Sequence, residues 1–316
     1  MEVAFKMSVQ DYKGKIGEVV IGKGDKAITI GGEVAMAFYD FDGKSPNTPK
    51  IGMEILDVYP EEWITPLKEM YKDVANNPVE WAKYVEKESN PDFICLKFEG
   101  SDPNGLDKTP EECAEVAKAV AEAITTPLVI AGSGNHEKDA KVFEKVAAAV
   151  EGYNCLFLSA TEDNYKTVGA AAGLAYAQKV GAESSVDINL AKQLNVLLNQ
   201  LGVKYDDMVM NIGSSAVGYG FEYVVSTADR IRLAALGQND QTLQLPIITP
   251  VSFETWGVKE TVAGEEDAPE WGCQEERGIA MEVSTAASII AVGSNAVIVR
   301  HPKSLETIKN LTVALA

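Results

Sequence analysis

The sequence predicts a single (β/α)₈ barrel, the TIM-barrel fold, preceded by an N-terminal β-hairpin. From residue 50 onward, short apolar runs alternate with longer helical patterns eight times. Alternation of this kind implies parallel strands joined by right-handed crossovers, and eight such units close into a barrel. The length of 316 residues suits one barrel domain. An open, doubly wound sheet is the alternative fold.

The expected elements follow in chain order. The strands are Ile51–Asp57, Phe93–Phe98, Leu128–Ala131, Cys155–Ser159, Ser185–Ile188, Met208–Ile212, Ile247–Val251 and Ala296–His301. The helices are Val79–Glu88, Pro110–Ala123, Glu137–Val150, Tyr165–Val180, Leu190–Leu201, Tyr223–Leu236, Arg277–Val292 and Lys303–Leu315. Thr109, Pro110 and Glu112 predict a capping box. Gly181 and Gly293 stand where C-cap glycines are expected.

Residues 1–48 differ from the rest of the chain. Two apolar runs, Glu18–Gly22 and Ala27–Gly31, flank the turn residues Lys23–Lys26 and predict a hairpin. The stretch Ser45–Pro49 then punctuates the chain. We therefore expect residues 1–48 to form a β extension that packs on a barrel of residues 49–316.

Composition excludes several classes of function. A formal net charge of −19 and a pI near 4.6 argue against nucleic acid and against an anionic membrane surface. The four cysteines, Cys95, Cys113, Cys155 and Cys273, lie far apart, so we expect no zinc site or iron–sulfur cluster within this chain. Neither a signal peptide nor a membrane-length apolar run is present, which indicates a cytoplasmic protein.

In a barrel of this kind, function resides in the loops that follow the strands. Here those loops are polar and rich in small residues, without an assembled catalytic set. Asp57, Glu99 and Asp187 could meet at the mouth as acid–base groups, or they could cap helices and pair with Arg300. His301 is expected to close the barrel through hydrogen bonds.

Three loops invite a closer interpretation. Gly213–Gly218 has the glycine spacing of a P-loop but lacks its Lys and Ser/Thr. Gly132–Asn135 could bind an anionic group with its amides, although a tight turn without ligand is favoured. The long segment Phe253–Glu276 carries Trp256 and Trp271, which either anchor a partner protein or pack the loop onto the barrel.

Taken together, these loops resemble those of the small subunit of the corrinoid/iron–sulfur protein, equivalent to the delta subunit of the acetyl-CoA decarbonylase/synthase complex. The resemblance spans nearly the whole chain. It is carried by Ile51–Val58, Leu96–Pro103, Val186–Asn195, Gly218–Tyr223, Arg230–Leu233, Trp271-Gly, Glu276–Gly278 and Arg300–Pro302.

The resemblance implies a non-catalytic subunit of a methyl carrier in the reductive acetyl-CoA (Wood–Ljungdahl) pathway. Its partner would be a large subunit that holds both the iron–sulfur cluster and the cobalamin, and the barrel mouth would face that cobalamin. The heterodimer would take a methyl group from a methyltetrahydrofolate methyltransferase and pass it to acetyl-CoA synthase/CO dehydrogenase. A reductive activator is a further implied partner.

We assign the cobalamin contact to polar residues of the βα loops. They are Asn135, Thr161, Asn164, Ser214 and Ser215. No catalytic or metal-binding residue is assigned.

Three alternatives stay open. The chain could be a free-standing pterin-binding methyltransferase that uses Asp57, Asp187, Asn189 and Asn211. It could also be a purely structural partner that never touches the cofactor. An aldolase-like lyase would need a Schiff-base lysine; Lys97 is the inward candidate, and we expect it to lie outside the mouth.

Overall fold

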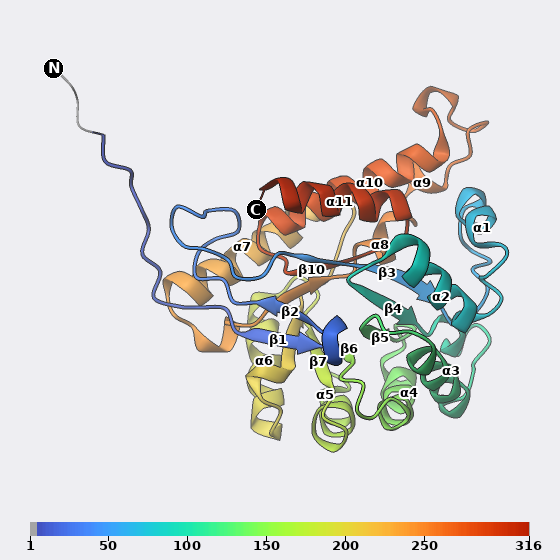
Figure 1. Cartoon of the computed structure of the whole chain (residues 1–316), viewed down its shortest axis with the longest axis horizontal. Helices are drawn as coiled ribbons and strands as arrows, with labels where there is room; N and C mark the ends of the chain where they lie inside the picture. Colours follow the sequence, from blue (N-terminus) through green and yellow to red (C-terminus); the bar gives the residue numbers. More distant parts are fainter. Residues whose placement is uncertain (1–4, 316) are drawn as a thin grey trace.

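The chain folds into a closed barrel of eight parallel strands (Figure 1). The computed structural model describes residues 5–315. The strands follow chain order around the barrel, and the last pairs with the first. They are β3 (Lys50–Leu56), β4 (Phe93–Lys97), β5 (Leu128–Ala131), β6 (Leu156–Ala160), β7 (Lys179–Glu183), β8 (Met208–Asn211), β9 (Ile247–Thr249) and β10 (Ala296–Val299). The predicted barrel is confirmed.

Helices surround the barrel and connect its strands (Figure 1). They are α1 (Thr65–Tyr71), α2 (Pro78–Ser89), α3 (Pro110–Ala123), α4 (His136–Ala149), α5 (Tyr165–Val168), α6 (Ile188–Leu201), α7 (Phe221–Gly237), α8 (Val251–Thr255), α9 (Lys259–Val262), α10 (Gln274–Ala291) and α11 (Pro302–Leu315). The predicted capping box of Thr109 and Glu112 opens α3. No helix among residues 5–315 is long and apolar enough to span a membrane.

The predicted hairpin, β1 (Glu18–Ile21) paired with β2 (Ile28–Gly31), closes the amino-terminal end of the barrel. Its inner side chains join the apolar cluster that fills the barrel interior between the eight strands. The hairpin members of that cluster are Val19, Ile21 and Ile30. The barrel is therefore sealed at this end, and only the carboxyl ends of the strands remain open for a site.

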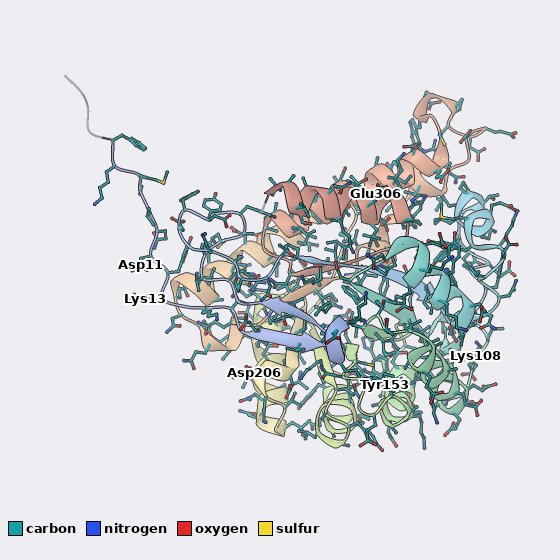
Figure 2. The ribbon with its side chains drawn as sticks, viewed as in Figure 1. Asp11, Lys13, Lys108, Tyr153, Asp206 and Glu306 are labelled. Carbon is teal, nitrogen blue, oxygen red and sulfur yellow. The ribbon has the colours of Figure 1, made fainter. Side chains whose placement is uncertain are left out.

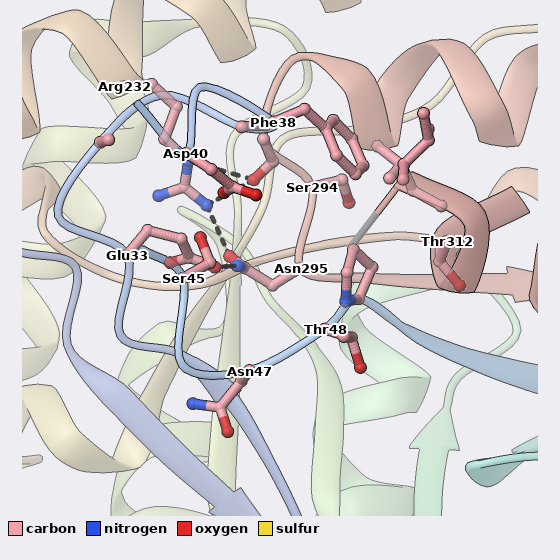
Figure 3. A pocket seen from close by; sticks show the side chains of 16 residues that line it. Glu33, Phe38, Asp40, Ser45, Asn47, Thr48, Arg232, Ser294, Asn295 and Thr312 are labelled. Atoms are coloured by element: carbon pink, nitrogen blue, oxygen red, sulfur yellow. Dashed lines mark hydrogen bonds between the residues drawn. The ribbon is translucent and has the colours of Figure 1, made fainter. Parts of the chain in front are cut away.

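A buried polar network fastens the chain after the hairpin to the same end (Figure 3). The Arg232 guanidinium donates to the carbonyls of Gly293 and Leu245 and to Asn295 Oδ1, and Asn295 Nδ2 donates to Glu33. All of them except Leu245 line a small cavity of about 90 Å³. Because Arg232 is fully engaged with backbone and Asn295, we assign this network to stability.

One strand was predicted wrongly. The fifth barrel strand is β7, whereas the sequence pattern placed it at Ser185–Ile188. Ser185 and Val186 have positive φ angles of 43° and 67°, which no strand can accommodate. The helix predicted over Tyr165–Val180 is also shorter: α5 passes into a π-helical segment that ends at Ala175, because β7 begins at Lys179.

Gly181 was accordingly assigned the wrong role. It is an inward residue of β7 and not a helix cap. A Cβ atom there would lie 2.4 Å from Leu158 Cδ2, so the barrel interior at this point has room only for glycine. Gly293, with φ 106°, does follow α10 as predicted.

Candidate functional site

A polar cavity of about 250 Å³ lies at the open end of the barrel. Residues from the ends of β4 to β9 and from the loops that follow them surround it. They include Lys97, Gly132, Ser133, Gly134, His136, Asp139, Leu158, Ser159, Thr161, Glu183, Asn211, Gly213, Ser214, Pro250, Phe253 and Glu254. This is the position at which barrels of this kind carry their sites.

Three side chains from neighbouring strands form a connected group in the cavity. Asn211 Nδ2 donates to Ser159 Oγ at 2.9 Å and to Glu183 Oε2 at 3.2 Å. Asn211 Oδ1 accepts from the Gly213 amide at 3.0 Å, which fixes the amide orientation. Burial raises the pKa of Glu183, and its hydrogen bond with Ser159 acts in the opposite direction. The group is held in one geometry.

Lys97 and Phe253 stand on the other side of the cavity. Lys97 Nζ lies 2.7 Å from Glu99 Oε2 and 4.8 Å from the centroid of the Phe253 ring. The expectation that Lys97 lies outside the mouth was wrong, because Phe93 and Cys95 of the same strand face the interior and Lys97 continues that alternation. Its ammonium group is paired with a carboxylate.

The Gly132–Asn135 loop is a tight turn whose amides are already occupied. The Asp139 carboxylate accepts from the amides of Ser133 and Gly134 at 2.8 and 3.0 Å and from Ser133 Oγ at 3.0 Å. A Cβ atom on Gly132 would lie 2.3 Å from Asp139 Cγ, so the close approach requires glycine. The amides of Ser133 and Gly134 are hydrogen-bonded within the chain, so the loop forms the tight turn that was favoured.

The three carboxylates considered as acid–base groups lie in separate surroundings. Asp57 accepts from the Gly100 amide at 2.8 Å and from Lys108 Nζ at 3.0 Å (Lys108 is labelled in Figure 2). Asp187 caps α6. Glu99 pairs with Lys97. They form no joint acid–base group.

Arg300 pairs with a carboxylate that the sequence did not single out. Its guanidinium makes a two-pronged contact with Glu54, with Nε 3.1 Å and Nη2 3.0 Å from Glu54 Oε2. Both side chains are buried, and the Trp63 ring covers the guanidinium at 4.1 Å. Glu54 pairs in register with the inward-facing Cys95, so this ion pair fills the barrel interior beside the cavity.

His301 closes the barrel through hydrogen bonds, as expected. The Lys303 amide donates to His301 Nδ1 at 3.0 Å, so Nε2 carries the proton and donates to Glu275 Oε1 at 3.0 Å. The ring stacks on Trp256 with a centroid separation of 6.0 Å. Burial lowers the pKa of His301 and favours the neutral ring.

The five residues assigned to the cobalamin contact fall into two groups. Thr161 and Ser214 line the cavity, and their hydroxyl oxygens are buried without a hydrogen-bond partner among the described residues. Asn135 caps α4, and Asn164 bridges the Thr161 amide and the His136 carbonyl. Ser215 lies in a neighbouring groove and donates to the Tyr219 carbonyl. The fold brings two of the five into the cavity.

Sequence reasoning missed most of the polar group in the cavity. Ser159 and Glu183 were not proposed for the cavity, and Asn211 was considered only for the pterin alternative. The apolar lining residue Phe253 was not proposed either. Glu183 could have been found only if β7 had been placed correctly, because its inward position follows from that strand. No group of three or more His, Cys, Asp or Glu within residues 5–315 is arranged to hold a metal ion.

Comparison with known proteins places the whole barrel in one family. The family model described as "CO dehydrogenase/acetyl-CoA synthase delta subunit" matches residues 18–312. The chain belongs to this family. The acetyl-CoA decarbonylase/synthase complex subunit delta of Archaeoglobus fulgidus is 34% identical, over 97% of this chain and 70% of its own length. The same subunit of Methanothermobacter thermautotrophicus is 33% identical, over 97% and 77%.

The family resemblance inferred from the loops is thus confirmed.

Solved structures with the same fold include dihydropteroate synthases. That of Xanthomonas albilineans has a TM-score of 0.59 at 10% identity and covers 94% of this chain and 98% of its own. That of Coxiella burnetii has a TM-score of 0.58 at 12% identity, with the same coverage. At such identity they show the fold alone.

The buried carboxyls of this delta-subunit family member predict a higher melting temperature at mildly acidic pH. Burial raises the pKa of five of them: Glu33, Asp57, Asp139, Glu183 and Glu282. Between their unfolded and folded pKa values the folded state binds more protons, so lowering the pH through this window stabilises the fold. His301, with a lowered pKa, opposes this near pH 6.5.

Differential scanning fluorimetry at high salt, which screens the surface charges, measures this balance. We expect the melting temperature to rise between about pH 7.5 and about pH 5, since five carboxyls outweigh one histidine. Carboxyls with a lowered pKa, such as Glu86 and Asp240, oppose the rise mainly below this range. If the melting temperature instead fell steadily over this range, the raised pKa values assigned to the buried carboxyls would be contradicted.

Proposed function

We propose that this chain is the small, non-catalytic subunit of a corrinoid-dependent methyl carrier. Its barrel mouth covers a cobalamin that a larger partner subunit holds. The observation that carries the proposal is the open mouth itself: its polar groups are fixed in place, while the hydroxyls of Thr161 and Ser214 have no partner within residues 5–315. Membership of the delta-subunit family supports it.

The residues at the mouth fit a corrinoid. The rim of a corrin bears amide side chains, which both donate and accept hydrogen bonds. A hydroxyl can donate to an amide oxygen or accept from an amide N–H. A buried hydroxyl without a hydrogen-bond partner is unfavourable. Within residues 5–315, Thr161 Oγ1 and Ser214 Oγ have no such partner, and hydrogen bonds to the corrin amides would remove this cost. When bound, the cobalamin supplies a cobalt centre that accepts and donates a methyl group.

This chain's own residues would shelter the reacting face. Leu158, Pro250 and Phe253 give the mouth an apolar wall, and the Lys97 ammonium group beside them is paired with Glu99. A cover of this kind excludes water and side reactants from a reactive centre. We assign to the mouth no general acid, base or nucleophile.

The cysteines support the division between two subunits. Cys95, Cys113 and Cys155 are buried as free thiols and Cys273 is exposed. An iron–sulfur cluster needs four thiolates at one place, which these positions do not supply, so we assign the cluster to the larger subunit. In the proposed reaction sequence the heterodimer receives its methyl group from a methyltetrahydrofolate methyltransferase. It would deliver that group to acetyl-CoA synthase/CO dehydrogenase. A reductive activator would return oxidised cobalt to its reduced state.

The test places a bulky side chain in the mouth and measures the cobalamin spectrum and the rate of methyl transfer. We expect Ser214→Trp, in complex with the large subunit, to change the visible spectrum of the cobalamin and to slow methyl transfer about tenfold or more, because the indole would occupy the space meant for the corrin. The matched control is Glu306→Trp on the outer helix α11 (labelled in Figure 2), which should leave both unchanged.

Two results would count against the proposal. An unchanged spectrum and rate in a folded Ser214→Trp complex would place the mouth away from the cofactor and favour the purely structural partner. Micromolar binding of methyltetrahydrofolate by the isolated chain, followed by tryptophan fluorescence, would favour the pterin-binding enzyme.

A further inference from the structure

The chain between α8 and α10 stands out from the body of the barrel (Figure 1). We call residues 257–276 the protruding segment. It follows β9 and so belongs to the open, carboxyl end of the strands, on the side of the candidate site. The segment contains α9, a short 3₁₀ turn at Pro269–Trp271 and the first three residues of α10, and its other residues form no helix or strand.

Side-chain hydrogen bonds to backbone carbonyls hold the protruding segment in one shape. Arg277 donates from Nε to the Glu260 carbonyl at 2.8 Å, from Nη1 to that of Gly272 at 2.9 Å, and from Nη2 to that of Ala263. Gln274 Nε2 donates to two further carbonyls of α9. A segment already ordered in this way loses little conformational entropy on binding a partner.

The protruding segment is also attached to the rim of the mouth. Tyr219, in the loop after β8, donates from its hydroxyl to Glu260 Oε2 at 2.6 Å. At the base of the segment, Trp256 is buried and its indole N–H donates to Glu282. The segment therefore keeps a fixed position relative to the candidate site.

The two tryptophans of this region have different roles. Trp256 is 4% exposed and packs the base, whereas Trp271 is 36% exposed. Val262, 48% exposed, lies in the same segment. Lys259 and Arg277 approach the Trp271 ring at 5.3 and 5.8 Å. Neither Trp271 nor Val262 belongs to the buried core among the described residues.

Acidic residues dominate the rest of the segment. Within residues 257–276 there are seven of them, against one lysine. The acidic residues are Glu260, Glu265, Glu266, Asp267, Glu270, Glu275 and Glu276. An aromatic anchor within a charged rim is the usual composition of a protein–protein interface, and the sign of the rim selects a partner surface of opposite sign.

We propose that the protruding segment is a docking surface for the subunit that faces the barrel mouth. Trp271 and Val262 enter an apolar depression of that subunit, and basic side chains around the depression meet the acidic rim. This inference rests on the proposed function, because it takes the cofactor-bearing subunit as the occupant. It adds the means by which that subunit is held over the mouth.

The test measures the dissociation constant between the full-length chain and the large corrinoid subunit, at low and at high salt. We expect Trp271→Ala to weaken binding about tenfold or more at both salt concentrations, as interface anchors do. The triple variant Glu266→Lys/Asp267→Lys/Glu270→Lys, which spares Glu265 because that carboxylate accepts from the Gln274 amide at 3.0 Å, is expected to weaken it mainly at low salt and to flatten the salt dependence. Both changes lie on exposed residues, so the melting temperature should stay constant.

Tyr39→Ala is the matched control, since Tyr39 is an exposed aromatic residue of the N-terminal extension, at the opposite end of the barrel. It should change the dissociation constant less than twofold. If the wild type binds the large subunit and both segment variants bind equally well, the docking inference is overturned while the proposed function stands. A wild-type chain that does not bind the large subunit overturns the proposed function, and the docking inference with it.

Discussion

Replacing Arg300 by alanine is expected to lower the free energy of unfolding by about 3–5 kcal/mol. The Glu54 carboxylate would stay inside the barrel without its cation, and both of its oxygens would lose a guanidinium donor. The Trp63 ring, which now covers the guanidinium, would face a void. Urea denaturation followed by circular dichroism measures the change.

An exposed ion pair provides the control for Arg300→Ala. Lys303 and Glu276 pair at 2.9 Å on the surface, with side chains 55% and 62% exposed. Lys303→Ala should cost under about 1 kcal/mol, because solvent screens such pairs. Removing both buried partners, with Glu54→Leu and Arg300→Met, should recover much of the loss. If Arg300→Ala proved as mild as Lys303→Ala, the ion pair would not have the structural importance assigned to it.

Adding a single methyl group at Gly278 is expected to destabilise the protein by about 3 kcal/mol. Gly278 lies in α10, and a Cβ atom there would come within 2.1 Å of the Trp256 ring. The ring cannot move without loosening its hydrogen bond to Glu282 and its stacking on His301. Gly278→Ala therefore tests whether Trp256 is fixed at the base of the protruding segment.

Gly237→Ala is the matched control for this change. Gly237 is the last residue of α7, and a Cβ atom there would meet nothing within 4 Å. The same methyl group should stabilise the protein by up to about 1 kcal/mol, because alanine loses less backbone entropy in a helix. Thermal unfolding of the two variants should give shifts of opposite sign. Equal shifts would contradict the tight packing described at Gly278.

Hydrophobic periodicity was sufficient to predict the barrel, because it is a local property. β5 has the predicted limits, and β4, β8, β9 and β10 begin at the predicted residues. The hairpin and the Thr109 capping box depend on neighbours in sequence, and both were predicted correctly. The error at Ser185–Ile188 has a local cause as well: two short apolar runs compete there, and only the backbone conformation excludes the second.

The sequence by itself determined the fold class, the hairpin, the wide spacing of the four cysteines and the family. Only the tertiary structure decided which polar side chains share the mouth, because Lys97, Glu183 and Asn211 are brought together by barrel closure and strand register. It also decided that Arg300 pairs with Glu54, and that Trp271 is exposed while Trp256 is buried. Such contacts join strands far apart in the chain, and no short-range pattern encodes which inward positions meet.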